Sequence, residues 1–138
     1  MKPQELLALA KDAMQKAYAP YSGFYVGAAL LAASGKVYTG CNIENAAFSP
    51  TNCAERTAFF KAVSEGEREF RAIAVVGGTG GEITGLCSPC GVCRQVMQEF
   101  CDPDFQIFMG KANDEYEICT LRELLPYAFA GEDHQLGG

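Results

Sequence analysis

Three cysteines and one glutamate have the types and spacing of a metal site with an acid/base group beside it. Cys90 and Cys93 form a Cys-x-x-Cys pair, and Cys53 lies earlier in the chain with Glu55 two positions after it. A Cys-x-x-Cys pair on one helical turn brings two sulfurs within reach of one ion, and a third thiolate leaves the fourth tetrahedral position of Zn²⁺ for water. A carboxylate beside the metal can move protons during hydrolysis. The pattern therefore predicts a hydrolytic zinc site.

These cysteines are predicted to lie where two helices begin. Residues 53–63 are rich in helix formers, so Cys53 opens this helix. A second helical run covers residues 90–100 and places Cys90 and Cys93 in its first turn. Helix N-termini carry unpaired N–H groups and partial positive charge, which favour the thiolate over the thiol. Two such helix starts that meet at one point would hold a cation between them.

Strands and helices alternate along the rest of the chain. A first amphipathic helix is predicted at residues 6–17, and a capping box of Thr120 and Glu123 opens a short last helix at residues 121–125. The glycine-rich residues 77–81 are predicted to form a loop. Strands are predicted at residues 26–32, 36–41, 71–76, 105–109 and 116–119. We expect a single domain over residues 1–138, an α/β protein with three α/β/α layers and a mixed sheet of roughly five strands.

Composition limits the classes of function. The 138 residues are 49% hydrophobic and 20% charged, which is typical of a folded domain. A net charge of −6 with no Lys/Arg cluster argues against a nucleic acid polymer as partner. No apolar stretch is long enough for a membrane span, and no signal peptide is recognisable, so we expect a cytoplasmic protein. The seven cysteines then indicate metal or redox chemistry, and the lone His134 excludes a site built on several histidines.

Three stretches carry a resemblance to a known family. They are residues 42–45 (Asn-Ile-Glu-Asn), 53–58 (Cys-Ala-Glu-Arg-Thr-Ala) and 88–95 (Ser-Pro-Cys-Gly-Val-Cys-Arg-Gln). The Cys-x-Glu and Pro-Cys-x-x-Cys parts match the zinc deaminase signature in its three-cysteine form. The chain resembles the short homotetrameric cytidine deaminases nearly from end to end. The resemblance implies their fold, and it implies hydrolytic deamination of cytidine and deoxycytidine to uridine and deoxyuridine, with release of ammonia, in pyrimidine salvage.

The resemblance also implies roles for individual residues. One Zn²⁺ per chain would be held by Cys53, Cys90 and Cys93, with Glu55 as the proton shuttle. The implied substrate contacts are Asn42 and Glu44 at the ribose, Phe24 against the pyrimidine, the backbone of Ala54, Ser88 and Pro89 near the base edge, and Phe129 in the site of a neighbouring subunit. Family members often carry tyrosine where this chain has Phe48, so a hydroxyl contact across the subunit interface is lost here.

Arg56 is a candidate for tuning the metal. Three thiolates make an electron-rich centre, which weakens zinc as a Lewis acid. Arg56 follows Glu55 in the first turn of the same predicted helix, so its guanidinium can donate charged hydrogen bonds to the ligand sulfurs and withdraw charge. The resemblance implies the same role.

Assembly is expected to complete the site. A chain of 138 residues has little surface with which to enclose a nucleoside and exclude water. We therefore expect a homotetramer in which Phe48 and Phe129 cross to neighbouring sites. The apolar residues 124–130 are followed by a polar tail, which fits burial of this segment against a partner or against its own core.

Several other interpretations remain open. Cys-Gly-Val-Cys also fits a thioredoxin-type redox pair, and a purely structural zinc module could use Cys87 as a fourth ligand. Cys41, Cys101 and Cys119 are expected, like Cys87, to be small buried side chains. A blasticidin-type aminonucleoside deaminase shares the zinc signature, although a carboxylate at Glu44 suits a free ribose hydroxyl. A polynucleotide-editing deaminase is disfavoured by the acidic composition and by the three-cysteine ligand set.

Overall fold

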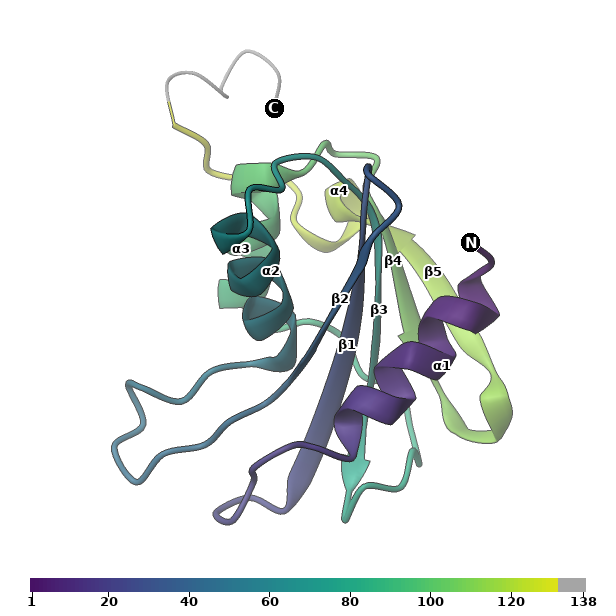
Figure 1. Ribbon diagram of the computed structural model, residues 1–138, viewed down its shortest axis with the longest axis vertical. Coiled ribbons are helices and arrows are strands. Elements are labelled where there is room, and N and C mark those ends of the chain that lie inside the picture. The colour runs from purple at the N-terminus through teal and green to yellow at the C-terminus, as the bar shows by residue number, and fades with distance from the viewer. Residues whose placement is uncertain (132–138) are drawn as a thin grey trace.

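The computed structural model describes residues 1–131, and a mixed five-stranded sheet lies at its centre (Figure 1). The strand order is β2-β1-β3-β4-β5; β3 and β4 run parallel, and the other neighbours are antiparallel. The elements are α1 (Pro3–Met14), β1 (Phe24–Ala32), β2 (Val37–Cys41), α2 (Ala54–Ser64), β3 (Phe70–Thr79), α3 (Gly91–Phe100), β4 (Gln106–Gly110), the 3-10 turn η1 (Ala112–Asp114), β5 (Tyr116–Thr120) and α4 (Leu121–Leu124).

Helices cover both faces of the sheet, as expected. Successive residues of β3 point to opposite faces: Ala72 and Ala74 belong to a cluster with α1, while Ile73 and Val75 belong to one with α2 and α3. Figure 1 shows α1 on one side of the sheet, with α2 and α3 side by side on the other. The predicted α/β class with three layers and a mixed sheet is therefore confirmed.

Two contacts determine the position of α2 and of its first turn. Phe59 in the middle of α2 stacks on Phe100 of α3, with ring centroids 6.4 Å apart. The first turn of α2 lies directly on β2 at Gly40, where an added Cβ would be 2.4 Å from the carbonyl oxygen of Ala54 and 2.7 Å from the amide nitrogen of Ala58. A side chain at this position would push the helix away, so glycine permits the close approach.

The predicted loop at residues 77–81 is wrong in its first part, because β3 continues to Thr79. Gly77 and Gly78 pair with Val26 and Tyr25 of β1. A Cβ on Gly78 would lie 1.6 Å from the carbonyl oxygen of Glu82, so these glycines mark a tight approach of backbone and not a loose segment. The turn begins at Gly80 and Gly81, both with positive φ.

The other elements agree with expectation to within a few residues. The first helix begins and ends three residues earlier than predicted, at Pro3 and Met14. The capping box of Thr120 and Glu123 opens α4. No helix within residues 1–131 is long and apolar enough to cross a membrane. The predicted polar tail around His134 lies outside the described residues.

Candidate active site

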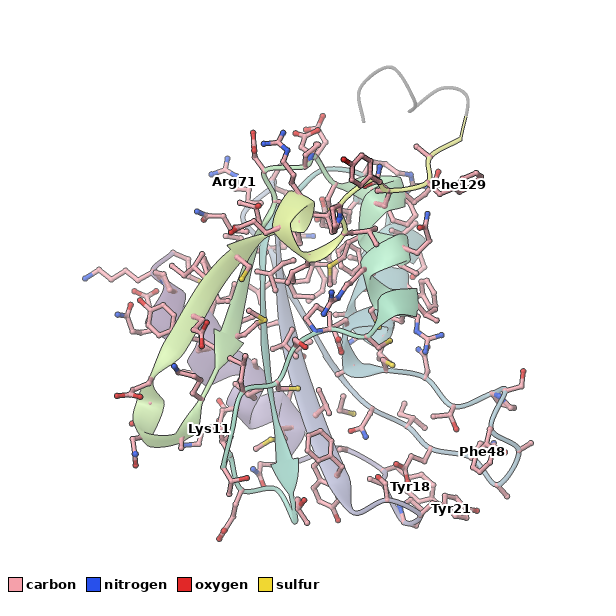
Figure 2. The ribbon with its side chains drawn as sticks, turned by 180° about the vertical axis from the view of Figure 1, so that it is seen from behind. Lys11, Tyr18, Tyr21, Phe48, Arg71 and Phe129 are labelled. Atoms are coloured by element: carbon pink, nitrogen blue, oxygen red, sulfur yellow. The ribbon has the colours of Figure 1, made fainter. Side chains whose placement is uncertain are left out.

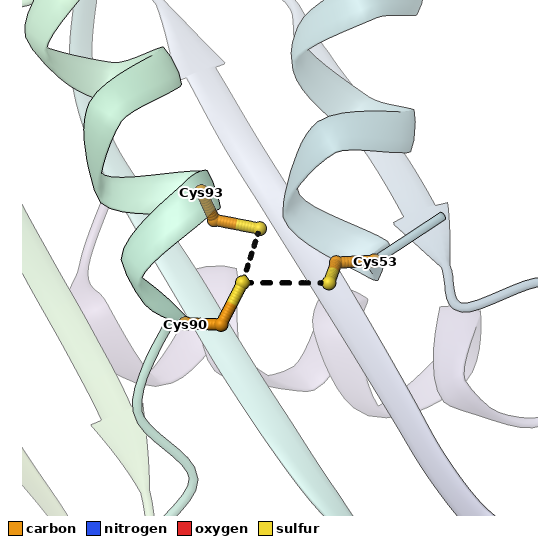
Figure 3. Close-up of side chains that lie close together, drawn as sticks. All are labelled: Cys53, Cys90 and Cys93. Carbon is orange, nitrogen blue, oxygen red and sulfur yellow. Dashed lines mark hydrogen bonds between the residues drawn. The ribbon is translucent and has the colours of Figure 1, made fainter. Parts of the chain in front are cut away.

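The three predicted zinc ligands come together at the starts of two neighbouring helices (Figure 3). Cys53 is the N-cap of α2, Cys90 is the N-cap of α3, and Cys93 lies in the first turn of α3. The sulfur of Cys90 is 3.6 Å from that of Cys53 and 3.4 Å from that of Cys93, and all three sulfurs lie within 4.8 Å of one another.

The donor set fits a tetrahedral zinc ion. Sulfurs bound to one Zn²⁺ at ~2.3 Å are roughly 3.8 Å apart, so little movement would bring these three onto a metal. Cys93 is buried, Cys53 is half-buried and Cys90 is exposed, which leaves one side of the cluster open to a fourth ligand from solvent. Within residues 1–131, these three cysteines have their potential ligand atoms close enough together to hold one metal ion.

Cys87, the alternative fourth ligand, lies outside this group. Its buried thiol packs against the backbone of Gly77 in β3, where an added Cβ would be 2.9 Å from the sulfur. Burial raises the pKa of Cys87 to about 12, so the thiol stays protonated. Cys41, Cys101 and Cys119 are only partly buried in the single chain, less than the sequence suggested.

Hydrogen bonds within the cluster favour a thiolate on Cys53. The thiol of Cys93 and the guanidinium of Arg56 donate to the Cys53 sulfur and, together with the Cys90 sulfur 3.6 Å away, lower its pKa to about 5, although partial burial opposes this shift. The proton stays on Cys93, whose pKa is raised by the same hydrogen bond and by burial. The cluster therefore gathers negative charge, and a divalent cation would stabilise it by replacing the shared protons.

Glu55 is buried beside the cluster, in the first turn of α2. Glu55 is 4% exposed, and within residues 1–131 no other charged residue is buried. Burial raises the pKa of Glu55 to about 7, and the nearby Cys53 thiolate adds to the rise. A carboxyl group with this pKa can take up and give back a proton near neutral pH.

Arg56 lies against the ligands as expected. One terminal nitrogen of its guanidinium donates to the Cys53 sulfur across 3.3 Å. Its Nε is buried and has no hydrogen-bond partner among the described residues. The guanidinium therefore has one contact to a thiolate and one buried N–H without an acceptor within residues 1–131. This arrangement favours negative charge at the site.

The segment that holds Asn42 and Glu44 pairs with the residue before Cys53. The backbones of Ile43 and Asn52 exchange two hydrogen bonds of 2.9 Å. The side-chain amide of Asn42 accepts from the backbone N–H of Val26 and donates to the carbonyl of Phe24, at 2.8 Å each. One N–H and one lone pair of this amide remain for a ligand.

The other candidate contacts either adjoin a cluster cysteine in the sequence or lie near Cys87. Phe24 opens β1 with 41% of its surface exposed, and its ring packs beside Gly77 next to Cys87. Ala54 is fully buried in the first turn of α2. Ser88 is exposed and Pro89 is buried immediately before Cys90.

Phe48 and Phe129 do not join this site within the chain. Phe48 is 85% exposed on the projecting loop between β2 and α2, and Phe129 is 76% exposed after α4. Figure 2 shows these two side chains at opposite ends of the molecule, each pointing outward. Both are therefore available to another subunit.

Two residues with a structural part in the site were not predicted. Arg94 donates from Nε to the carbonyl of Pro89 and from a terminal nitrogen to the carbonyl of Leu124, at 2.7 Å each, and so ties the ligand loop to the C-terminal segment. Ser22 donates from its hydroxyl to the carboxylate of Glu44. A serine in a Pro-Tyr-Ser-Gly turn signals a side-chain hydrogen bond, but the sequence does not say to which partner.

Three thiols at two helix starts, with a buried carboxyl group of pKa about 7 beside them, define a metal-dependent hydrolase. A family model described as the cytidine and deoxycytidylate deaminase zinc-binding region matches residues 1–109. The chain is 53% identical to a cytidine deaminase of Sporosarcina psychrophila, over 96% of this chain and 95% of the relative. It is 50% identical to one of Halalkalibacterium halodurans, over 96% and 98%.

Solved structures agree. A crystal structure of cytidine deaminase from Burkholderia pseudomallei matches with a TM-score of 0.86 and 48% identity, covering 94% of this chain and all of the other. The corresponding structure from Mycobacterium tuberculosis has a TM-score of 0.79 and 37% identity, covering 95% and 99%. This chain belongs to the cytidine deaminase family. Its metal is zinc, for which Cys53, Cys90 and Cys93 are positioned.

Proposed function

We propose that this protein deaminates cytidine and deoxycytidine by hydrolysis, giving uridine, deoxyuridine and ammonia, with one zinc ion per chain. The observation that carries the proposal is the cluster of Cys53, Cys90 and Cys93 with buried Glu55 beside it. Relatives that are 50% and 53% identical over most of the chain carry the name cytidine deaminase. We treat residues 1–138 as a single catalytic domain.

Glu55 is assigned the proton transfers. Water adds to the ring carbon that bears the amino group, a C–O bond forms, and the C–N bond then breaks to release ammonia. When bound, zinc would supply the Lewis acid that makes water reactive near neutral pH. The Glu55 carboxylate takes a proton from the attacking water and passes it to the adjacent ring nitrogen. It then takes the second proton from the hydroxyl group formed on the ring carbon and gives it to the leaving amino group, so that the carbon becomes a carbonyl as ammonia departs. Its pKa of about 7 supports both directions of transfer.

Arg56 is assigned to charge balance. Three thiolates would give the ion more negative charge than a Lewis acid should carry. The guanidinium bound to the Cys53 sulfur withdraws part of that charge and holds the ligand in place.

The nucleoside is assigned to the surface beside the cluster. Asn42 and Glu44 would bind the ribose hydroxyls, and the exposed ring of Phe24 would pack on the pyrimidine. The backbone of Ala54, Ser88 and Pro89 would contact the polar edge of the base. This arrangement suits a small nucleoside in the cytoplasm, in pyrimidine salvage, and the net charge of −6 disfavours a nucleic acid polymer.

A homotetramer would complete the pocket. Phe48 and Phe129 are large apolar side chains that this chain leaves 85% and 76% exposed. We assign both to the sites of neighbouring subunits, where they would exclude water. Because position 48 is phenylalanine, its contribution there is apolar contact without a hydroxyl hydrogen bond.

Ammonia release tests the proposal. Cytidine, deoxycytidine, free cytosine and a blasticidin-type aminonucleoside are each incubated with the zinc-loaded protein. The two nucleosides should be turned over, and the free base much less, because it lacks the ribose that Asn42 and Glu44 would bind. Preferential use of the aminonucleoside would overturn the assignment of substrate, and equal use of the free base would remove the need for a ribose contact.

A further inference from the structure

A tight turn before β1 encloses the carboxylate of Glu44. The backbone N–H groups of Tyr21 and Ser22 donate to one carboxylate oxygen at 2.9 and 3.1 Å. The hydroxyl of Ser22 donates to the other oxygen. The turn itself is closed by a 3.0 Å hydrogen bond from the Gly23 N–H to the Ala19 carbonyl. Three donors from one turn therefore converge on a single side chain.

The Ser22 hydroxyl links two residues that are assigned to the substrate. It accepts a 3.0 Å hydrogen bond from the backbone N–H of Phe24, so its own proton is free for Glu44. One oxygen atom thus joins the proposed ribose-binding carboxylate to the first residue of β1, whose ring is assigned to the base. The hydroxyl therefore ties the Glu44 carboxylate to the backbone of Phe24.

The donors leave Glu44 with limited freedom and limited capacity. A carboxylate has about four acceptor positions, of which the turn occupies three. The remaining acceptor position lies on Oε2, the oxygen that accepts from the Ser22 hydroxyl. These hydrogen bonds, that of the Ser22 side chain first, lower the pKa of Glu44, so the group is ionised at neutral pH. An ionised carboxylate with one free acceptor position suits a single hydroxyl donor.

We propose that Ser22 is a positioning residue that fixes the carboxylate of Glu44 for a ribose hydroxyl and sets its distance from Phe24. The inference rests on the proposed ribose role of Glu44. Ser22 acts through Glu44 and Phe24 and takes no part in the chemical step. Its loss should therefore weaken nucleoside binding and blunt the recognition of ribose hydroxyls, while the zinc cluster and the proton transfers are unaffected.

The chain offers a matched control in Ser34. This serine lies in the turn between β1 and β2, where its hydroxyl donates to Glu67 at 2.7 Å and accepts from the backbone N–H of Lys36 at 3.4 Å. The chemistry is the same as that of Ser22, with a carboxylate as acceptor and the N–H two residues on as donor. None of the proposed substrate contacts is involved, so Ser34→Ala reports the cost of losing such a hydroxyl outside the site.

The test compares KM and kcat for cytidine and for 2′,3′-dideoxycytidine, with zinc content measured in each variant. In Ser22→Ala, KM for cytidine should rise roughly 3- to 30-fold with kcat within about twofold, because the Glu44 carboxylate keeps its backbone donors and loses only the hydroxyl that orients it. The preference for cytidine over the dideoxy analogue should fall toward that of Glu44→Ala. Ser22→Thr, which keeps the hydroxyl, should show the wild-type preference for cytidine. Ser34→Ala should also leave this preference unchanged.

The outcomes separate this inference from the one it rests on. If Glu44→Ala lowers the preference and Ser22→Ala keeps the wild-type value, Ser22 has no positioning role although the ribose contact stands. If Glu44→Ala itself keeps the preference, the ribose assignment is wrong and the inference about Ser22 falls with it. Adding Ser22→Ala to Glu44→Ala should cause no further loss of preference; an additive loss would overturn a role exerted through Glu44.

Discussion

The guanidinium of Arg56 donates a hydrogen bond to the sulfur of Cys53 across 3.3 Å, so a positive charge contacts one of the three cysteines positioned to hold zinc. The contact joins positions three residues apart at the start of α2, where the helix itself favours negative charge. It is therefore maintained by the helix geometry and does not depend on distant packing. A zinc ion bound here would be held by a thiolate whose negative charge Arg56 partly neutralises.

Arg56→Gln should keep zinc and lower activity. The amide keeps some hydrogen-bonding capacity but removes the charge, so the ligand sulfurs become more electron-rich and zinc a weaker Lewis acid. We expect kcat for cytidine to fall about 10- to 100-fold. Arg68→Gln is the control, since this exposed guanidinium donates to the carbonyls of Val63 and Glu67, away from the cysteine cluster. Unchanged kcat in Arg56→Gln with full zinc would show that the contact does not tune the metal.

Glu55→Gln should separate proton transfer from folding. The side chain keeps its size and its hydrogen-bonding shape inside the protein, but it cannot carry a proton. Turnover of cytidine should fall at least ~10²-fold while zinc content and thermal stability are retained. Glu65→Gln, an exposed change at the C-terminal end of α2, should be silent. Near-normal turnover in Glu55→Gln would remove this residue from the mechanism.

Gly40→Ala should displace the start of α2, and with it Glu55, and so lower both stability and activity. The added methyl group would meet the backbone of Ala54 and Ala58, so the start of α2 has to move off β2. Overpacking of this kind costs about 1–3 kcal/mol of unfolding free energy, and a 1 Å displacement of catalytic groups can cost about 10²-fold in rate. Thermal unfolding and kcat/KM for cytidine measure the two effects.

The control for this change is Gly85→Ala. An added Cβ at Gly85 has no heavy atom within 4 Å, so the variant should unfold and react like the wild type. If Gly40→Ala also behaved like the wild type, the approach of α2 to β2 would not be what positions Glu55.

Phe129→Ala should weaken substrate binding without loss of zinc. In the proposed homotetramer this ring closes the site of a neighbour, and removing a buried phenyl ring should raise KM for cytidine about 10-fold. Ile118→Ala shortens an exposed apolar side chain on β5 and should leave KM unchanged. Sedimentation of the wild type should give four chains. A fully active monomer would leave no role for Phe48 or Phe129 across an interface.

Local sequence patterns predicted the helix starts that hold the metal. The positions of Cys53 and Cys90 at helix starts and the capping box at Thr120 depend on residues within one turn of the chain, so the sequence displays them directly, although Cys90 proves to be the N-cap and not part of the first turn. The order of strands and helices followed from hydrophobic periodicity. The ligand set was predictable because it combines these local signals with the known coordination chemistry of zinc.

Features that depend on distant partners were missed or misread. Gly77 and Gly78 looked like loop because their strand character comes from pairing with β1. The tie from Arg94 to Leu124 joins positions 30 residues apart, and the Ser22 hydroxyl reaches Glu44 22 residues away. The helix and strand propensities of single residues carry no information on contacts between residues far apart in the sequence. The crossing of Phe48 and Phe129 stays a prediction because it depends on other subunits.

Cysteine variants test the ligand set. Cys90→Ala removes one of the three sulfurs and should lower bound zinc well below one ion per chain. Cys87→Ala removes a buried thiol outside the cluster and should keep one ion per chain. Zinc is measured by elemental analysis of the purified proteins. Loss of zinc in the Cys87 variant would make the site a four-cysteine structural one.

The most direct test measures ammonia released from cytidine against zinc bound per chain, in protein stripped of metal and reloaded in steps. Turnover should rise in proportion to zinc, start from zero, and level off at one ion per chain. The Cys87→Ala protein should follow the same line. Deamination by the zinc-free protein, or no ammonia at one zinc ion per chain, would contradict the account.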